Sequence, residues 1–217
     1  MPCSCDYGDL AGQLFNEKKV GKELKSYRRS GAGPTTRLLR DGLVNAGLAR
    51  GSLLDIGSGI GALTFDLLDR GMTEATSIDA SPASMVQAKA EAERRALSDR
   101  VRFVHADFLD AAGQCQRATV VTLDRVVCCY PFYEPLLEQA LRLADRGIAL
   151  SYPRERWFVR AFLWADNAKR GVQGCAFRAF VHPVDRIQRV IQQAGFTLVS
   201  RQTTLTWTAD VFARRAP

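Results

Sequence analysis

The chain has no run of about 18 apolar residues, so the sequence predicts no membrane-spanning helix. The first residues, MPCSCDYGDL, lack the basic and apolar regions of a secretory signal, so we expect a cytoplasmic protein. Only two histidines are present, and six cysteines among 217 residues are too few for a disulfide scaffold. The spacing of Cys3, Cys5 and the adjacent pair Cys128 and Cys129 matches no structural zinc pattern, so we expect no metal.

Acidic residues are fewer than basic ones, which leaves a net charge of +7. Positive charge is concentrated in KKVGKELKSYRR (18–29), and such a surface attracts anions. No zinc-knuckle or aromatic RNA-binding signature accompanies it. A small-molecule partner is therefore favoured over nucleic acid, and the sequence gives no oligomeric state.

Apolar runs and helical patterns alternate from residue 52 onward, and the runs are continuous, as in strands buried on both faces. We expect an α/β fold with a doubly wound, mostly parallel, seven-stranded sheet and N-terminal helices over 9–29 and 35–48. The expected strands are 52–56, 75–79, 101–105, 118–123, 147–152, 196–203 and 205–213. The further expected helices are 60–69, 82–97, 135–144, one within 154–181, and 183–194.

A glycine-rich turn joins the first of these strands to the next helix. In LLDIGSGIGALTFDLLDRG (53–71), Gly57, Gly59 and Gly61 lie where a nucleotide-binding loop needs them. Glycine lets the backbone turn tightly and approach a ligand closely. Gly57, Gly59 and Ala62 also satisfy the dinucleotide pattern, so the loop alone does not select the ligand.

Aspartates near the ends of four strands narrow the choice of ligand. Asp79 can accept hydrogen bonds from two ribose hydroxyls, which both NAD and S-adenosylmethionine (SAM) carry. Asp107 is placed for an adenine amino group, and Asp124 closes the fourth strand over the middle of the site. Asp55 would repel a pyrophosphate but suits the ammonium group of SAM. The pattern favours SAM over a nicotinamide or flavin cofactor.

Three stretches, LLDIGSGIGALTFDLLDRG, ATSIDASPASM and VRFVHADFLD, resemble the motifs of class I SAM-dependent methyltransferases, which have a Rossmann-like fold. The resemblance covers about 35–150 and implies an enzyme that transfers a methyl group from SAM. By this resemblance, the residues that hold SAM are Asp55, Gly57, Ser58, Gly59 and Gly61 for its amino-acid part, Asp79 for the ribose, and Ala80, Asp107 and Phe108 for the adenine.

A nearer likeness runs over about 14–212. LFNEKKVGKELKSY, LDRVVCCYP, YPR, FVHP, AGFTLV and TWTADVFARR are similar to segments of magnesium-protoporphyrin O-methyltransferases. Where that family has a tyrosine and a histidine implicated in its chemistry, this chain has Leu14 and Cys129. The departure implies a related enzyme with a different acceptor.

Methyl transfer is an in-line displacement, so the enzyme mainly aligns donor and acceptor and excludes water. The candidates for acceptor-side catalysis are Cys129 and Tyr130 after the fourth strand and His182 before the last helix. His105 lies inside a strand and is expected to be a core or edge residue.

Arginines and aromatic residues supply further acceptor candidates. Arg125, Arg154, Arg156 and Arg160 can pair with an anionic molecule. Either Trp157, Phe162 and Trp164 form apolar walls of the site or they face the core. In the N-terminal helices, Tyr7, Phe15 and Tyr27 are candidates for a lid over SAM.

These observations predict one methyltransferase domain over 1–217, with a helical lid (1–48), a SAM-binding half (49–152) and an acceptor-side half (153–217). The expected acceptor is a small molecule that is anionic or aromatic. Three alternatives stay open: a thiol or metalloid methyltransferase that uses the cysteines, an RNA methyltransferase, and a non-catalytic SAM-binding protein.

Overall fold

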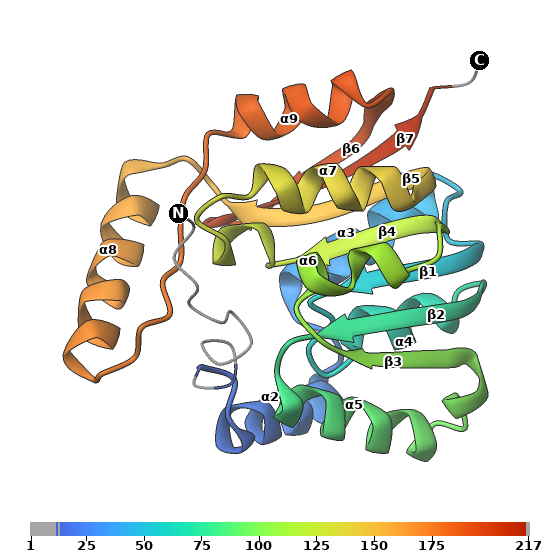
Figure 1. Ribbon diagram of the computed structural model, residues 1–217, viewed down its shortest axis with the longest axis horizontal. Helices are drawn as coiled ribbons and strands as arrows, with labels where there is room; N and C mark the ends of the chain where they lie inside the picture. The colour runs from blue at the N-terminus through green and yellow to red at the C-terminus, as the bar shows by residue number, and fades with distance from the viewer. Residues whose placement is uncertain (1–11, 13, 216–217) are drawn as a thin grey trace.

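A single seven-stranded sheet organises the chain, whose computed structural model describes residues 12 and 14–215 (Figure 1). The strand order is β3-β2-β1-β4-β5-β7-β6. The strands are β1 (Gly51–Ile56), β2 (Met72–Asp79), β3 (Val101–His105), β4 (Ala118–Asp124), β5 (Ala144–Pro153), β6 (Phe196–Thr203) and β7 (Trp207–Arg214). Every neighbouring pair from β3 to β5 is parallel, while β7 runs antiparallel to both β5 and β6. The expected doubly wound, mostly parallel sheet is therefore confirmed.

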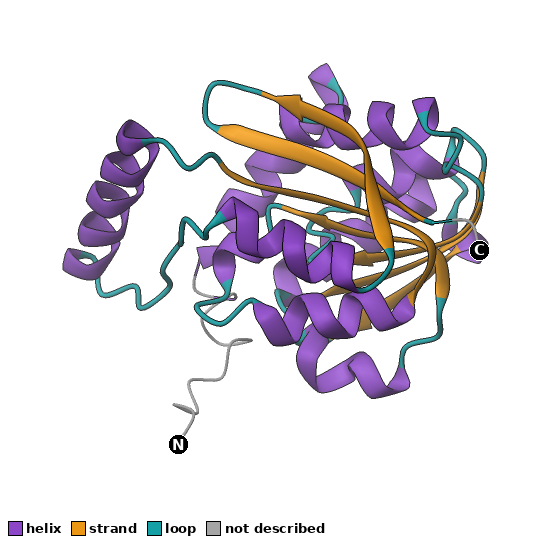
Figure 2. Ribbon diagram, turned by 90° about the horizontal axis from the view of Figure 1, so that it is seen from above, coloured by secondary structure: helices purple, strands orange, loops and turns teal. Residues whose placement is uncertain are grey.

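Helices cover both faces of this sheet (Figure 2). The α-helices of the described residues are α2 (Glu17–Ser30), α3 (Pro34–Asn45), α4 (Ala62–Leu68), α5 (Pro82–Arg94), α6 (Phe108–Ala111), α7 (Glu134–Leu143), α8 (Trp157–Val172) and α9 (Val184–Gln193). In α5, Ser81 caps the first turn by accepting a hydrogen bond from the Ser84 amide, and Pro82 follows it. The expected helix over 82–97 ends earlier, at Arg94, because the chain turns at Ala96, whose φ of 54° is left-handed.

The hydrophobic core has two halves, one on each face of the sheet. Leu53 of β1 packs in the half that α3 and α4 cover, and the next residue, Leu54, packs in the half that α6, α7 and α9 cover. Because successive side chains of a strand point to opposite faces, a strand covered on both faces is a continuous apolar run. Both faces are thus buried.

Two helices lie at the carboxyl ends of the parallel strands and border the site. α2 packs against α5, and α8 extends beyond the ends of the strands, at the left of Figure 1. In the part of the chain that the structure describes, no helix is both long and apolar enough to cross a membrane.

Candidate active site

A cavity of about 740 Å³ opens at the carboxyl ends of the parallel strands. Its volume is within the range of small-molecule sites. The sequence-predicted residues that line it are Asp55, Gly57, Ser58, Gly59, Asp79, Ala80, Phe108, Asp124, Cys129 and Tyr130. Three other predicted residues, Gly61, Asp107 and His182, are outside its lining. Asp107 and His182 instead contact Tyr130, which does line the cavity.

The glycine loop between β1 and α4 has a backbone that few other residues could adopt. Gly57 has a φ of 64°, and a Cβ at this position would lie 2.4 Å from Cγ2 of Val126. Gly61 has a φ of 80° and precedes the first turn of α4. Between them, the Ser58 hydroxyl is buried and has no hydrogen-bond partner within the described residues. An orphaned buried hydroxyl beside a close backbone approach fits a loop that binds a polar ligand.

Asp79 links the glycine loop to the start of α5. Its two carboxylate oxygens accept hydrogen bonds from the Gly59 amide and the Ser81 amide, both at 2.8 Å. Burial raises the pKa of Asp79, whereas these amides lower it. An ionised carboxylate offers about four acceptor positions, so this one can still accept from two hydroxyls.

Asp55 is buried at the end of β1. It accepts hydrogen bonds from the hydroxyls of Thr64 (2.7 Å) and Thr122 (2.6 Å). Burial raises the pKa of Asp55 to about 7, although both hydroxyls oppose the shift. A ligand ammonium group next to this carboxylate would favour its ionised form.

Asp107 contacts the cavity wall through Tyr130. Its carboxylate caps α6 by accepting from the Leu109 amide at 3.0 Å, and it also accepts from the Tyr130 hydroxyl at 2.7 Å. Burial first, and then the Asp107 charge, raise the pKa of Tyr130. The phenol is therefore neutral at physiological pH and serves as a hydrogen-bond donor rather than a base.

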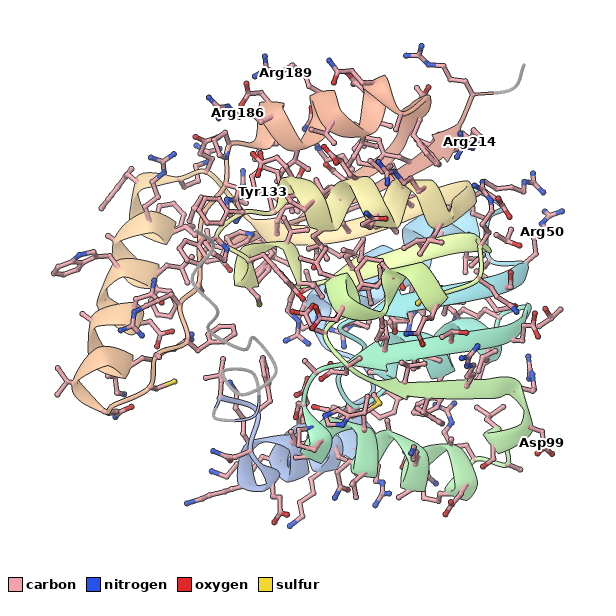
Figure 3. The ribbon with its side chains drawn as sticks, viewed as in Figure 1. Arg50, Asp99, Tyr133, Arg186, Arg189 and Arg214 are labelled. Carbon is pink, nitrogen blue, oxygen red and sulfur yellow. The ribbon has the colours of Figure 1, made fainter. Side chains whose placement is uncertain are left out.

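His182 contacts the backbone of Tyr130 from outside the cavity. Its Nε2 lies 2.9 Å from the Tyr130 carbonyl oxygen, so that nitrogen donates the hydrogen bond. Its ring is 4.3 Å from the ring of Tyr133, which Figure 3 shows at the start of α7. Burial lowers the pKa of His182. The ring is outside the cavity lining, so contact with an acceptor, as expected from sequence, is not what this geometry provides.

Asp124 and Arg125 connect the end of β4 to the N-terminal helices. Asp124 accepts hydrogen bonds from the hydroxyls of Thr36 (2.5 Å) and Ser151 (2.6 Å). Arg125 has a left-handed φ of 63°, which is uncommon for a residue with a side chain. Its guanidinium reaches Glu23 of α2 at 3.3 Å. This ion pair therefore links α2 to a cavity-lining residue whose backbone conformation is strained.

Two adjacent thiols, Cys128 and Cys129, line the cavity. The Sγ atoms of Cys128 and Cys129 are 3.9 Å apart, and both donate to the Arg125 carbonyl oxygen. The neighbouring thiol and burial raise the pKa of Cys128, which keeps it protonated. Within 12 and 14–215, no three His, Cys, Asp or Glu side chains are grouped to hold a metal. Cys3 and Cys5 are outside the described residues.

Several arginine and aromatic candidates prove to be elsewhere. Arg154 donates to the Thr204 carbonyl oxygen and Arg160 pairs with Glu155, whereas Arg125 does line the cavity. Arg156 is exposed and is not part of the lining. Sequence reasoning missed Lys19 and Arg170, which both line the cavity. The basic stretch 18–29 was a signal for Lys19.

Only one of the three aromatic candidates on α8 lines the cavity. Phe162 lines the cavity, but Trp157 and Trp164 do not and are 80% and 74% exposed, so they face neither the site nor the core. Of the lid candidates, Phe15 and Tyr27 line the cavity, and Tyr7 is outside the described residues. His105 is exposed on the edge strand β3, as an edge residue should be.

Comparisons with known proteins agree with this fold. Residues 49–195 match the family described as a methyltransferase domain. Magnesium protoporphyrin IX methyltransferase from Synechocystis PCC 6803 with bound S-adenosylhomocysteine (SAH) is 19% identical over 95% of this chain and 99% of its own, with a TM-score of 0.71. The same enzyme with SAM is 18% identical over 99% of this chain and 100% of its own, with a TM-score of 0.71.

The cyclase SpnF is 13% identical over 98% of both chains, with a TM-score of 0.70. At these identities the likenesses establish the fold and leave the acceptor open. A comparison with curated protein sequences finds no match. The family match covers well over half of the chain, and the orphaned Ser58 hydroxyl, the glycine loop and Asp79 fit SAM. The chain therefore belongs to the methyltransferase domain family and is a SAM-dependent methyltransferase of the class I, Rossmann-like fold.

Proposed function

We propose that this methyltransferase acts on a small-molecule acceptor that is anionic, aromatic or both. The observation that carries the proposal is the uneven distribution of charge around the cavity. Asp55, Asp79 and Asp124 lie around the glycine loop, whereas Lys19, Arg125 and Arg170 line the sides toward α2 and α8. Glu23 and Asp166 also line those sides and pair with Arg125 and Arg170, so Lys19 leaves one positive charge in excess there. Cations in a partly desolvated cavity favour an anionic ligand over a neutral one.

The proposed SAM-holding residues are those implied by the resemblance, together with Asp124 at the end of the fourth strand. They are Asp55, Gly57, Ser58, Gly59, Gly61, Asp79, Ala80, Asp107, Phe108 and Asp124. When bound, SAM supplies an activated methyl group. Cys129 and Tyr130 are proposed to contact the acceptor, and His182 to position Tyr130 through its carbonyl oxygen. The lid (1–48), SAM-binding half (49–152) and acceptor-side half (153–217) are proposed as parts of one domain.

Calorimetric titration of the protein with SAM and with SAH tests the cofactor assignment. Asp79→Ala should abolish micromolar binding, because the ribose hydroxyls lose their acceptor. Asp99→Ala is the matched control, since Asp99 is exposed at the far end of the sheet, at the lower right of Figure 3. Equal binding by the two variants would remove Asp79 from the site.

The acceptor class is tested by SAH release from paired compounds that differ only in one carboxylate. The proposal expects faster turnover of the anionic member of each aromatic pair. Preference for the neutral member in every pair would contradict it.

A second candidate function is transfer to a thiol or a metalloid, which the pair Cys128 and Cys129 at 3.9 Å favours. Soft sulfur ligands suit such acceptors. The double substitution Cys128→Ser and Cys129→Ser should then abolish turnover while SAH binding persists. Retained activity on the true acceptor would remove this candidate, and Cys175→Ser provides a thiol control outside the cavity lining.

A further inference from the structure

Four side chains form a continuous bridge along the cavity between the start of α2 and α8. Nζ of Lys19 lies 4.6 Å from the ring centroid of Phe15. The ring of Phe15 meets the ring of Phe177 edge-on, with centroids 6.1 Å apart. Cζ of Arg170 lies 5.6 Å from the Phe177 centroid. All four residues line the cavity, so two cations and two aromatic rings face the same space.

Arg170 carries an unused hydrogen-bond donor at this place. Its Nη2 pairs with Asp166 one turn earlier on α8. Its Nη1 is buried and has no hydrogen-bond partner within the described residues. A buried donor without a partner costs free energy, and a guanidinium can bind an anion through two nitrogens. Arg170 therefore keeps a donor that no described residue satisfies.

Lys19 adds a second cation, and no described carboxylate lies within salt-bridge distance of it. Among the residues described, its ammonium group makes no ion pair. The two carboxylates that attract it, Glu23 and Asp166, pair with Arg125 and Arg170 instead. Burial and the positive charge of Arg170 both lower the pKa of Lys19. Two neighbouring cations repel each other, and an anion placed between them would relieve that repulsion.

We propose that Lys19 and Arg170 form a subsite that binds the non-reacting anionic group of an aromatic acceptor, with Phe15 and Phe177 in contact with its ring. The inference rests on the proposed function and specifies which residues select the acceptor. Arginine suits carboxylate and phosphate oxygens because its planar donors match their geometry. The two phenyl rings provide the apolar surface that a flat molecule covers.

Pyridoxal 5′-phosphate is a suitable probe, because it is an aromatic aldehyde that carries a phosphate. Its aldehyde condenses with a neutral lysine amine and releases water, and borohydride then reduces the imine to a stable secondary amine. Peptide mapping should show that Lys19 is modified several-fold faster than Lys18, a neighbour that is exposed like Lys19 but lies outside the cavity lining. Pyridoxal, which lacks the phosphate, should show a much smaller preference for Lys19.

The variant Arg170→Gln tests the second cation. It should reduce modification of Lys19 to the rate of Lys18, while SAH titration should give the affinity of the unaltered protein. Arg178→Gln is a control from the same region, since Arg178 is outside the cavity lining. A purely structural role for Arg170 would leave the preference for Lys19 intact or would weaken SAH binding as well.

Equal modification of Lys18 and Lys19, or an equal preference for Lys19 with and without the phosphate, would overturn the subsite. The comparison of the two aldehydes uses the unaltered protein, so it tests the subsite even if Arg170→Gln fails to fold. Failure of SAH to bind the unaltered protein would instead overturn the proposed function. The two failures are therefore distinguishable.

Discussion

At the scale of single residues, the buried carboxyl of Asp55 makes the site sensitive to pH. Burial raises its pKa from 3.8 to about 7, so the folded protein binds a proton more tightly there than the unfolded chain does. For a carboxyl with a raised pKa, the contribution to stability is present at low pH. It is lost as the pH rises from about 4 through about 7. In the free protein, this group therefore opposes stability at neutral pH.

Ligand binding should have the opposite pH dependence. The ammonium group of SAM or SAH favours ionised Asp55, so affinity should fall as the pH drops through about 7. The limiting slope is roughly tenfold per pH unit for one coupled proton. Titration calorimetry of SAH across this range measures it.

The variant Asp55→Asn should bind SAH weakly, and its affinity should not change with pH in this range. A slope that survives in Asp55→Asn would assign the proton to another group.

At the scale of elements, α2 is held over the site by polar contacts rather than by apolar area alone. The Tyr27 hydroxyl donates to Asp66 at 3.0 Å and accepts from Arg95 at 2.6 Å. Glu91 of α5 is fully buried and pairs with Arg28 of α2 at 2.8 Å. These contacts join α2 to α4 and to the end of α5.

Tyr27→Phe should lower the free energy of unfolding by about 1–2 kcal/mol, because two hydrogen bonds to charged groups are lost. Urea denaturation measures the change. Tyr133→Phe is the matched control, since the Tyr133 hydroxyl is buried without a hydrogen-bond partner in the described part of the chain. Equal losses in the two variants would show that the Tyr27 contacts contribute nothing net.

At the scale of the whole molecule, a charged network joins the antiparallel end of the sheet to its parallel part. Asp210 of β7 is fully buried and accepts from Nε (2.7 Å) and Nη2 (2.6 Å) of Arg201 in β6. It also accepts from the Tyr152 hydroxyl in β5. Removal of one partner from a buried pair leaves an uncompensated charge.

Arg201→Met should therefore destabilise the protein by about 2 kcal/mol, less than for a fully buried pair because Arg201 is partly exposed. Thermal and urea unfolding measure this loss. Arg189→Met removes an exposed pair with Asp185 on α9 and should change stability by less than about 0.5 kcal/mol. A similar small change in Arg201→Met would contradict the role of the network.

Local features of the sequence predicted the fold class and the SAM loop. The apolar run of β1 and the glycines after it follow one another directly in the chain, so a short sequence pattern is enough to recognise them. The ends of parallel strands meet at one edge, which brings Asp55, Asp79 and Asp124 to one cavity. The strand 101–105 has the expected bounds, whereas β5 begins at Ala144 rather than at residue 147.

The sequence by itself thus determined a doubly wound sheet, a SAM-type loop and the residues at the strand ends. Only the tertiary structure decided which distant groups meet, because such contacts depend on how helices pack. Helical periodicity could not say which face of α8 is inward, so Arg170 was missed and Trp157 and Trp164 were given the wrong surroundings. Lys19 and Arg170 line the same cavity although they are about 150 residues apart in the chain, and no local pattern encodes such proximity.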